Sequence, residues 1–261
     1  MKIAVAVKQV GAFDDAPDLM PDAALVPSTS LRRTVNEWDL FALEAALELR
    51  DEHGAEVVAI TVGDEEADEA LRTCLAKGAD RGVRVWADQM EPDPLTVARL
   101  LAEVLRGESP DLIFCGAQSS DAMHASTGTA LAGLLDLSRV AVIKRLCYDV
   151  EANAVQADRE LESGLVERVS VAAPALLTLQ TGGNQPRHAN LRAIKQAERQ
   201  PLEVLGLGDI GLQADDLERA AGAHVRRLAP PDRSGRAEMI EGGPDEIAQK
   251  ILEIVSSRLA P

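Results

Sequence analysis

Aromatic side chains and positive charge are both scarce in this sequence. Phe, Trp and Tyr make up 2% of the 261 residues, which is too few for a surface that stacks nucleic acid bases or for a pocket of aromatic rings around a planar cofactor. The 27 Lys and Arg are outnumbered by 43 Asp and Glu, so the formal net charge is −16. Because a field of that sign repels phosphate backbones and anionic lipid, we expect no nucleic acid partner.

Cysteine is also scarce, and its placement excludes a disulfide framework. Cys74, Cys115 and Cys147 lie far apart and form no CxxC pair, a pattern typical of a reducing cytoplasm rather than of a secreted scaffold or a zinc cluster. The histidines show no HExxH spacing, and no segment approaches the roughly 20 apolar residues of a membrane span. We therefore expect a cytoplasmic protein with no membrane insertion, no metal site and no catalytic residues of a hydrolytic kind.

The first 150 residues alternate between two patterns. Apolar runs typical of buried strands cover residues 2–9, 56–63, 82–87 and 110–116. Segments with apolar residues at helical spacing lie between them, at residues 39–54, 64–78 and 94–107. Short strands that alternate with helices form right-handed βαβ units. The sequence therefore predicts an α/β fold with a doubly wound, mostly parallel, Rossmann-like sheet.

The pattern changes near residue 153. Residues 154–173 alternate between apolar and polar around a central Glu-Ser-Gly, which predicts a β-hairpin insertion. One more buried strand follows at 174–180. Regular periodicity then fades, and the chain is rich in Pro and Gly before a final amphipathic helix at 244–259. We expect an α/β nucleotide-binding core at 1–200 and a C-terminal arm at 201–261 that contacts a partner.

The glycines at positions 206, 208 and 211 match GxGxxG. A dinucleotide fingerprint of this form belongs inside a βαβ unit, with an acidic residue on the next strand. Only irregular chain follows here, so the context favours a loop with turn glycines over dinucleotide binding.

A second glycine-containing turn is the better candidate for a phosphate site. The stretch GAQSSDAMHASTGTALAGLL begins at Gly116, directly after the strand at 110–116, and leads into a helix. Open α/β sheets bind ligands at the carboxyl ends of their strands, and helix N-termini favour anions. Asp121, Ser126, Thr127 and Gly128 would supply hydroxyls and amides there. The alternative is a capped helix whose small residues allow close packing on the sheet.

The first helix raises a similar choice. Asn36 and Asp39 stand at its start, in the sequence NEWD. Either residue can cap the helix through its side chain. The other interpretation is a second loop facing the same ligand.

Taken together, the segments resemble the beta subunit family of electron transfer flavoproteins over essentially the whole chain. The first strand, VAVKQV, and the first helix, NEWDLFALEAALELRDE, are similar to their counterparts in that family. So is the run from Ala157 to Thr178, with its Arg, Glu-Ser-Gly, Glu and Pro at the family's spacing. Residues 185–191, QPRHANL, resemble the family's EPRYATL-type segment.

The resemblance implies an adenine nucleotide in the turn that begins at Gly116. In simple members the nucleotide is AMP, and in electron-bifurcating members it is part of a second FAD. Carried over to this chain, the implied contacts are Ala6, Asn36, Asp39, Val62, Gly116, Gln118, Asp121, Ser126, Thr127 and Gly128. A further FAD is shared with the alpha subunit and lies mainly there.

The resemblance also implies partners. A heterodimer with the alpha subunit would accept electrons from a flavoprotein dehydrogenase, with Leu191 as the docking residue, and pass them to a downstream acceptor. Such a chain is an electron-carrier subunit rather than a stand-alone enzyme. Two alternatives stay open: a bifurcating complex that oxidises NADH at the second FAD, and a nucleotide-binding module with no redox role. Without the resemblance, the residues favour a short helix at 191–197 that packs Leu191 and Ile194 onto the core.

Overall fold

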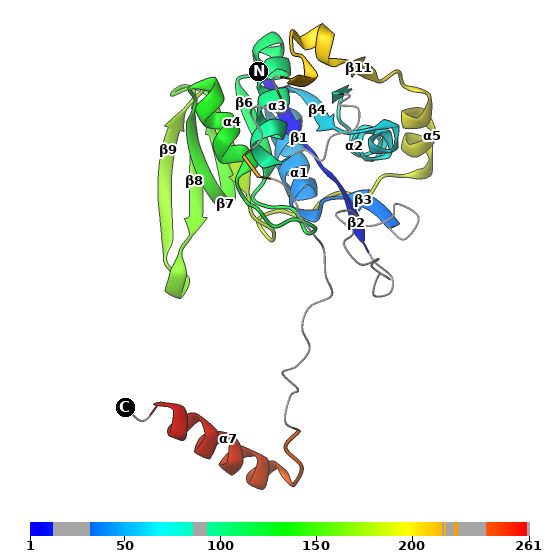
Figure 1. The fold of residues 1–261 in the computed structure, drawn as a ribbon. Helices are drawn as coiled ribbons and strands as arrows, with labels where there is room; N and C mark the ends of the chain where they lie inside the picture. The colour runs from blue at the N-terminus through cyan, green and yellow to red at the C-terminus, as the bar shows by residue number, and fades with distance from the viewer. Residues whose placement is uncertain (13–31, 86–92, 216, 218–221, 224–238, 260–261) are drawn as a thin grey trace. The chain divides into compact units, whose positions relative to one another are not determined.

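The computed structural model describes residues 1–12, 32–85, 93–215, 217, 222–223 and 239–259. The chain divides into two compact units. The first comprises residues 1–17 and 26–226, and the second comprises residues 18–25 and 227–261. The first unit carries the central sheet (Figure 1). In the second, the described part contains the predicted C-terminal helix, α7 (Pro244–Leu259).

The strands of the first unit form a sheet in the order β11-β5-β4-β1-β6-β10-β7-β8-β9 (Figure 1). Every pairing from β11 to β7 is parallel, and β8 and β9 add antiparallel. The bounds are β1 Lys2–Ala6, β4 Glu56–Val62, β5 Arg81–Val85, β6 Leu112–Gly116, β7 Ser138–Asp149, β8 Ala154–Glu160, β9 Val166–Ala172, β10 Ala175–Leu179 and β11 Glu203–Leu205. The predicted mostly parallel α/β sheet is confirmed.

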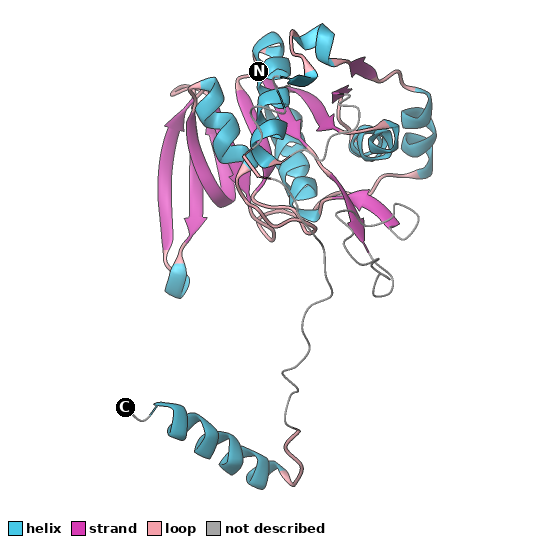
Figure 2. Ribbon diagram, viewed as in Figure 1, coloured by secondary structure: helices cyan, strands magenta, loops and turns pink. Residues whose placement is uncertain are grey.

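Helices cover both faces of the parallel part of the sheet (Figure 2). Buried residues of α1 (Glu37–His53) and α2 (Asp68–Lys77) form one core cluster, and those of α3 (Pro94–Glu108) and α4 (Thr127–Leu135) form another. Strand β4 shows why its sequence is a continuous apolar run: Val57 and Ala59 belong to the first cluster, whereas Val58 and Ile60 belong to the second. A strand buried on both faces is mostly apolar, and Thr61, a polar residue within β4, is itself 1% exposed.

Local signals set the helix ends. Asp93 caps α3, because its carboxylate accepts a hydrogen bond of 2.9 Å from the Leu95 amide, and Pro94 occupies the first helical position. Gly54 ends α1 in the left-handed conformation, with a φ of 69°. Such ends hold α1 and α3 to lengths that match the sheet beneath them.

Shorter elements complete the first unit. Strands β2 (Gln9–Ala12) and β3 (Arg32–Val35) form a separate antiparallel pair. The hairpin between β8 and β9 turns through a short 3-10 helix, η3 (Glu162–Gly164), in which Ser163 has a φ of 61°. Helix α5 (Leu191–Arg199) lies against α2.

The chain beyond residue 200 adds one more strand to the sheet. Strand β11 pairs in parallel with β5. The GxGxxG stretch follows it and contains only the 3-10 helix η4 (Leu207–Ile210), with Gly211 in a left-handed turn at a φ of 72°. Leu217 is buried in the core beside α3 and is 1% exposed. The glycines therefore serve a turn, not the strand–helix junction that a dinucleotide fingerprint requires.

Candidate nucleotide-binding site

The carboxyl ends of β4, β1 and β6 lie side by side at one edge of the sheet. Strand β1 lies between the other two, with Ala6 opposite Ile60 of β4 and Cys115 of β6. The chain winds outward from β1 through β4 to β5, then returns to β6 on the other side of β1. This reversal makes the β1–β6 edge the topological switch point, where open α/β sheets bind ligands.

The structure brings the predicted site residues to this edge. Ala6, Val62 and Gly116 end β1, β4 and β6. The turn from β6 to α4, the 116–128 turn, supplies all the others except Asn36 and Asp39, which stand at the start of α1. Residues far apart in sequence therefore surround a single strand–helix junction.

Asp39 joins the ends of β1 and β6. Its Oδ2 accepts a hydrogen bond of 2.7 Å from the Lys8 amide, and its Oδ1 accepts one of 2.9 Å from the Gly116 amide. The side chain is buried, with 5% of the residue exposed. Burial raises the pKa of Asp39 to about 7, although both backbone hydrogen bonds oppose that rise. Asp39 thus fixes the base of the 116–128 turn.

Asn36 holds the turn itself. Its Nδ2 donates to the Gln118 carbonyl at 2.9 Å, and its Oδ1 accepts from the Ser120 amide at 3.2 Å. The residue occupies the N-cap position of α1 but makes no side-chain capping bond there. The expectation that Asn36 or Asp39 caps the helix is therefore wrong, because the long-range bonds to the turn use both side chains.

An ion pair spans the opening of the turn. Lys8 Nζ lies 2.7 Å from Asp121 Oδ1 and 3.4 Å from Ser119 Oγ. Burial on its own would raise the pKa of Asp121, but the hydrogen bonds from Lys8 and Ser119 and the charge of Lys8 outweigh it and lower that pKa. Lys8 therefore brings a positive charge to this edge of a strongly acidic chain.

Two glycines in the turn are required by close approach. A Cβ on Gly116 would lie 2.4 Å from Asp39 Oδ1. A Cβ on Gly128 would lie 2.7 Å from Thr178 Cγ2 and 2.8 Å from Cys115 Sγ. Gly128 thus allows α4 to lie against β10 and β6. The close-packing interpretation is confirmed for Gly128, and it does not exclude a ligand above the turn.

The rest of the turn is exposed and has an irregular backbone. Residues 120–126 are all exposed. Met123 and Ala125 adopt the left-handed conformation, with φ values of 54° and 50°. Such conformations are unfavourable for these residue types and cluster at ligand sites. Ser126 precedes α4 but does not cap it with its hydroxyl, so no side-chain oxygen of Ser126 blocks the first-turn amides of Thr127 and Gly128.

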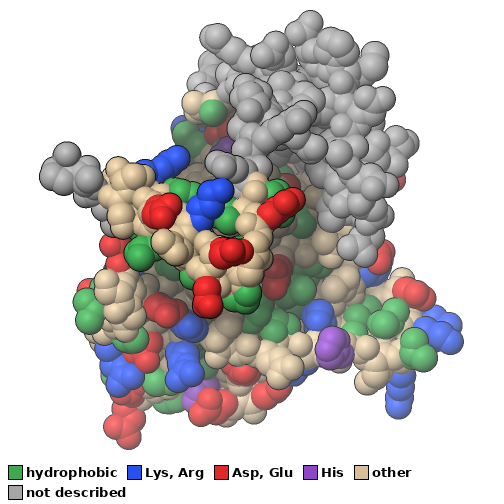
Figure 3. All heavy atoms as spheres, turned by 90° about the horizontal axis from the view of Figure 1, so that it is seen from below, with side chains coloured by type: hydrophobic (Ala, Val, Ile, Leu, Met, Phe, Trp, Pro, Cys, Tyr) green, Lys and Arg blue, Asp and Glu red, His purple; other side chains and the backbone are tan. Residues whose placement is uncertain are grey.

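Figure 3 shows the molecule from below the view of Figure 1, and the acidic and basic side chains of the described residues are intermingled there. The net charge of −16 is therefore not gathered as one acidic patch on that visible surface.

The predicted docking residue, Leu191, lies in residues 184–200, which include α5 and are called the 184–200 segment below. Leu191, its first helical residue, is 78% exposed, while Asn190 caps the helix by accepting a 2.9 Å bond from the Ala193 amide. Ala197 is the buried contact of the helix. The interpretation that Leu191 packs onto the core is wrong, because the small Ala197 fills that place.

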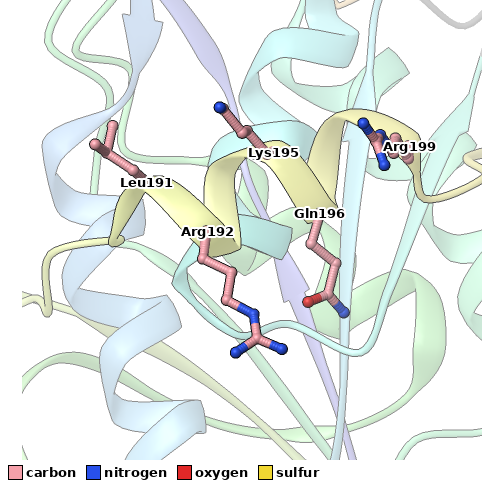
Figure 4. Close-up of a pocket in the computed structure, with 5 residues that line it drawn as sticks. All are labelled: Leu191, Arg192, Lys195, Gln196 and Arg199. Carbon is pink, nitrogen blue, oxygen red and sulfur yellow. The ribbon is translucent and has the colours of Figure 1, made fainter.

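The exposed side of α5 is basic. Leu191 lies next to a surface pocket with four polar or basic side chains of the same helix (Figure 4). They are Arg192, Lys195, Gln196 and Arg199.

Sequence reasoning missed Lys8 and Glu44. Lys8 is the first charged residue after β1, and that position was its only signal. Glu44 stands between Leu43 and Leu47 on the apolar face of α1 and is buried, with 5% exposed. A carboxylate at such a position normally has a partner, which here is Arg187.

Other expectations can be checked against the described residues. All three cysteines are unpaired. The part of the chain that the structure describes contains no cluster of side chains able to hold a metal ion. Nor do its helices include one with the length and hydrophobicity needed to cross a bilayer.

Comparison with known proteins gives a consistent result. Residues 25–209 match the family model described as electron transfer flavoprotein domain. The electron transfer flavoprotein subunit beta of Methylophilus methylotrophus is 45% identical over 260 residues, 98% of each chain. The subunit of the same name from Bacillus subtilis is 31% identical over 247 residues, 94% of each chain. That of Mus musculus is 33% identical over 216 residues, 81% of this chain and 84% of the relative.

Proposed function

Because the chain belongs to the electron transfer flavoprotein beta subunit family, we propose that it pairs with an alpha subunit and carries electrons from flavoprotein dehydrogenases to a downstream acceptor. The redox chemistry is that of the FAD held mainly by the alpha subunit, whose site this chain completes. The unpaired cysteines support work in a reducing compartment, the cytoplasm.

We further propose that this chain binds AMP in the 116–128 turn. The observation that carries this proposal is the pair of side chains, Asn36 and Asp39, that fix an exposed turn at the topological switch point. The turn ends at a helix N-terminus, whose dipole favours a phosphate. Left-handed backbone, found here at Met123 and Ala125 before α4, is also part of anion-binding nests. A bound nucleotide would stabilise the folded chain without taking part in electron transfer.

The residues fit an adenine nucleotide better than a flavin ring. The segments around the turn contain no Phe or Tyr from 115 to 147, and Trp38 Nε1 already donates to Gln180 Oε1 at 2.7 Å. Within residues 115–147 an isoalloxazine ring would find no Phe, Trp or Tyr side chain on which to stack. Ser126, Thr127 and Gly128 would hold the phosphate, and Gln118 and the ends of β1 and β4 the adenosine.

The test is the cofactor content of the purified heterodimer. The two subunits are co-expressed, the complex is denatured, and released small molecules are quantified by mass spectrometry and absorbance. We expect one FAD and one AMP for each heterodimer. Two FAD and no AMP would instead establish the bifurcating alternative, and neither nucleotide nor flavin would refute both.

Docking of the dehydrogenase is assigned to Leu191. It is an exposed apolar side chain surrounded by basic and amide groups, which is the composition of an interface anchor. The described helix of the second unit is assigned to the alpha subunit. Its residues Ile251, Leu252, Ile254 and Val255 are 39–65% exposed, and an exposed apolar face on an amphipathic helix is typical of an interaction surface.

A further inference from the structure

Arg187 makes an unusually complete set of contacts with the buried Glu44 of α1. Its backbone amide donates to Glu44 Oε2 at 2.8 Å, its Nε donates to Oε1 at 3.0 Å, and its Nη2 donates to Oε1 at 2.9 Å. Its Nη1 reaches Asp51 Oδ2, also on α1, at 2.9 Å. The planar fork of arginine is the side chain that can bind one carboxylate through several bonds and still reach a second.

Further bonds fix the chain on either side of this pair. The Arg187 carbonyl accepts a hydrogen bond from Lys77 of α2. Asn184 Nδ2 donates to the Phe41 carbonyl of α1 at 3.0 Å. The start of the 184–200 segment is thus attached to two helices of the core.

The far end of the segment is attached independently. Arg72 of α2 donates to the Ala197 carbonyl at 2.6 Å and also to the carbonyl of Gln200. Gln200 Nε2 donates to the Asp80 carbonyl at 2.8 Å. The chain is therefore attached to the core on both sides of Leu191, which is the first residue of α5 and lies four residues after Arg187.

We propose that the Arg187–Glu44 pair positions the 184–200 segment so that Leu191 is presented to the dehydrogenase in one orientation. This inference rests on the proposed docking role of Leu191. An anchor that is ordered before binding avoids the entropy loss of ordering it in the complex. A buried ion pair adds little stability compared with apolar residues of the same volume, so stability alone gives no reason for a carboxylate at position 44.

Two substitutions break the pair with opposite effects on charge. Glu44→Gln makes the protein more positive, whereas Arg187→Ala makes it less positive. If the pair positions Leu191, both changes lower kcat/KM for the reduced dehydrogenase. The expected loss is about tenfold, because Leu191 must then be ordered during binding. If Arg187 acts only through long-range charge, the two variants change kcat/KM in opposite directions and the proposal is wrong.

Arg187→Lys separates geometry from charge, because lysine keeps the charge but lacks the fork. We expect it to behave like Arg187→Ala; a wild-type value for Arg187→Lys would overturn the proposal. The matched control is Arg168→Lys, which removes the two-bond geometry of the Arg168–Asp158 pair, with bonds of 2.7 and 3.0 Å, on the β8–β9 hairpin. That control should retain the wild-type kcat/KM. All measurements use the co-expressed heterodimer, with flavin content and direct reduction by dithionite as checks that the carrier is intact.

A cycle with Leu191→Ala identifies the route of the effect. If Arg187 acts through Leu191, Glu44→Gln causes no further loss of kcat/KM in the Leu191→Ala background, while its effect on melting temperature is the same in both backgrounds. Full additivity of the two losses in kcat/KM refutes the positioning role. A wild-type rate for Leu191→Ala alone refutes the docking role and this inference with it. A slow Leu191→Ala with normal Glu44→Gln and Arg187→Lys refutes only this inference.

Discussion

Replacing Asp39 with asparagine should change how stability depends on pH. The carboxylate accepts one backbone amide on each oxygen, from Lys8 and from Gly116. In Asp39→Asn the side chain has a single acceptor oxygen, and its NH2 group faces the other amide. An unsatisfied buried donor costs about 1–3 kcal/mol, and this cost is independent of pH.

The wild-type residue has a cost that does depend on pH. Burial raises the pKa of Asp39 from 3.8 to about 7. Between those values the folded protein binds more protons than the unfolded chain, so wild-type stability falls as pH rises and is flat above the folded pKa. At ~1.4 kcal/mol for each pH unit, the loss between about pH 5 and pH 7 is ~3 kcal/mol.

Asparagine does not titrate, so the free energy of unfolding of the variant should rise by ~3 kcal/mol relative to that of the wild type between about pH 5 and pH 8. Near pH 5 the two proteins should be similar, and near pH 8 Asp39→Asn should be the more stable. Urea unfolding of both proteins across this range measures the difference directly. Parallel pH profiles would show that Asp39 does not titrate there and would refute the reasoning.

Asp121→Asn is the matched control for that experiment. The pKa of Asp121 is lowered below its usual value, although burial acts in the opposite sense, because Lys8 and Ser119 bind the charged form. A group with a depressed pKa contributes stability that is fully present above the unfolded value and is lost only in more acidic solution. The difference between Asp121→Asn and the wild type should therefore stay constant across the same range.

Three further outcomes follow from the structure. Thr127→Glu should remove the nucleotide by charge repulsion while leaving kcat/KM for the dehydrogenase unchanged. Thr129 is exposed on the same helix, and the Thr129→Glu control should retain the nucleotide, as measured by mass spectrometry of the denatured heterodimer. Deletion of residues 239–261 should weaken capture of the alpha subunit, measured by calorimetry, without the core damage that a deletion from residue 206 would cause by removing the buried Leu217. Gly183→Ala should lower the free energy of unfolding by several kcal/mol, since its Cβ would lie 1.5 Å from the Lys144 carbonyl oxygen and the backbone must move; a melting temperature equal to the wild type would contradict it.

Local patterns predicted most of the fold because the elements depend on local properties. Residues 57–60 are a continuous apolar run because β4 is buried on both faces, and the alternating residues at 154–173 form a hairpin. The last parallel strand escaped prediction. Strand β11 has three residues, and two of them, Glu203 and Val204, are exposed, so no periodicity identifies it.

The candidate site was predicted in position but not in mechanism. The carboxyl edge followed from the order of strands and helices. The partners of Asp39 and Asn36 did not, because Asp39 meets a residue 77 positions away and Asn36 one 82 positions away. Capping involves residues that are close in sequence, so a local pattern can predict it. A bond between distant segments depends on the order and register of the strands, which local periodicity does not predict. The same reason hid the pairing of Glu44 with Arg187, which are 143 residues apart.

Both proposed functional surfaces are fixed to the same helix. The start of α1 supplies Asn36 and Asp39 to the nucleotide turn, and its middle supplies Glu44 to the 184–200 segment. Each attachment has its own hydrogen bonds: Asn36 and Asp39 bind the turn, and Glu44 binds Arg187. Helix α1 is also buried along one face in the main core. We therefore expect the two proposed sites to respond independently to substitution: changes at the proposed nucleotide turn should alter stability, and changes at the proposed docking residue should alter the rate of electron transfer.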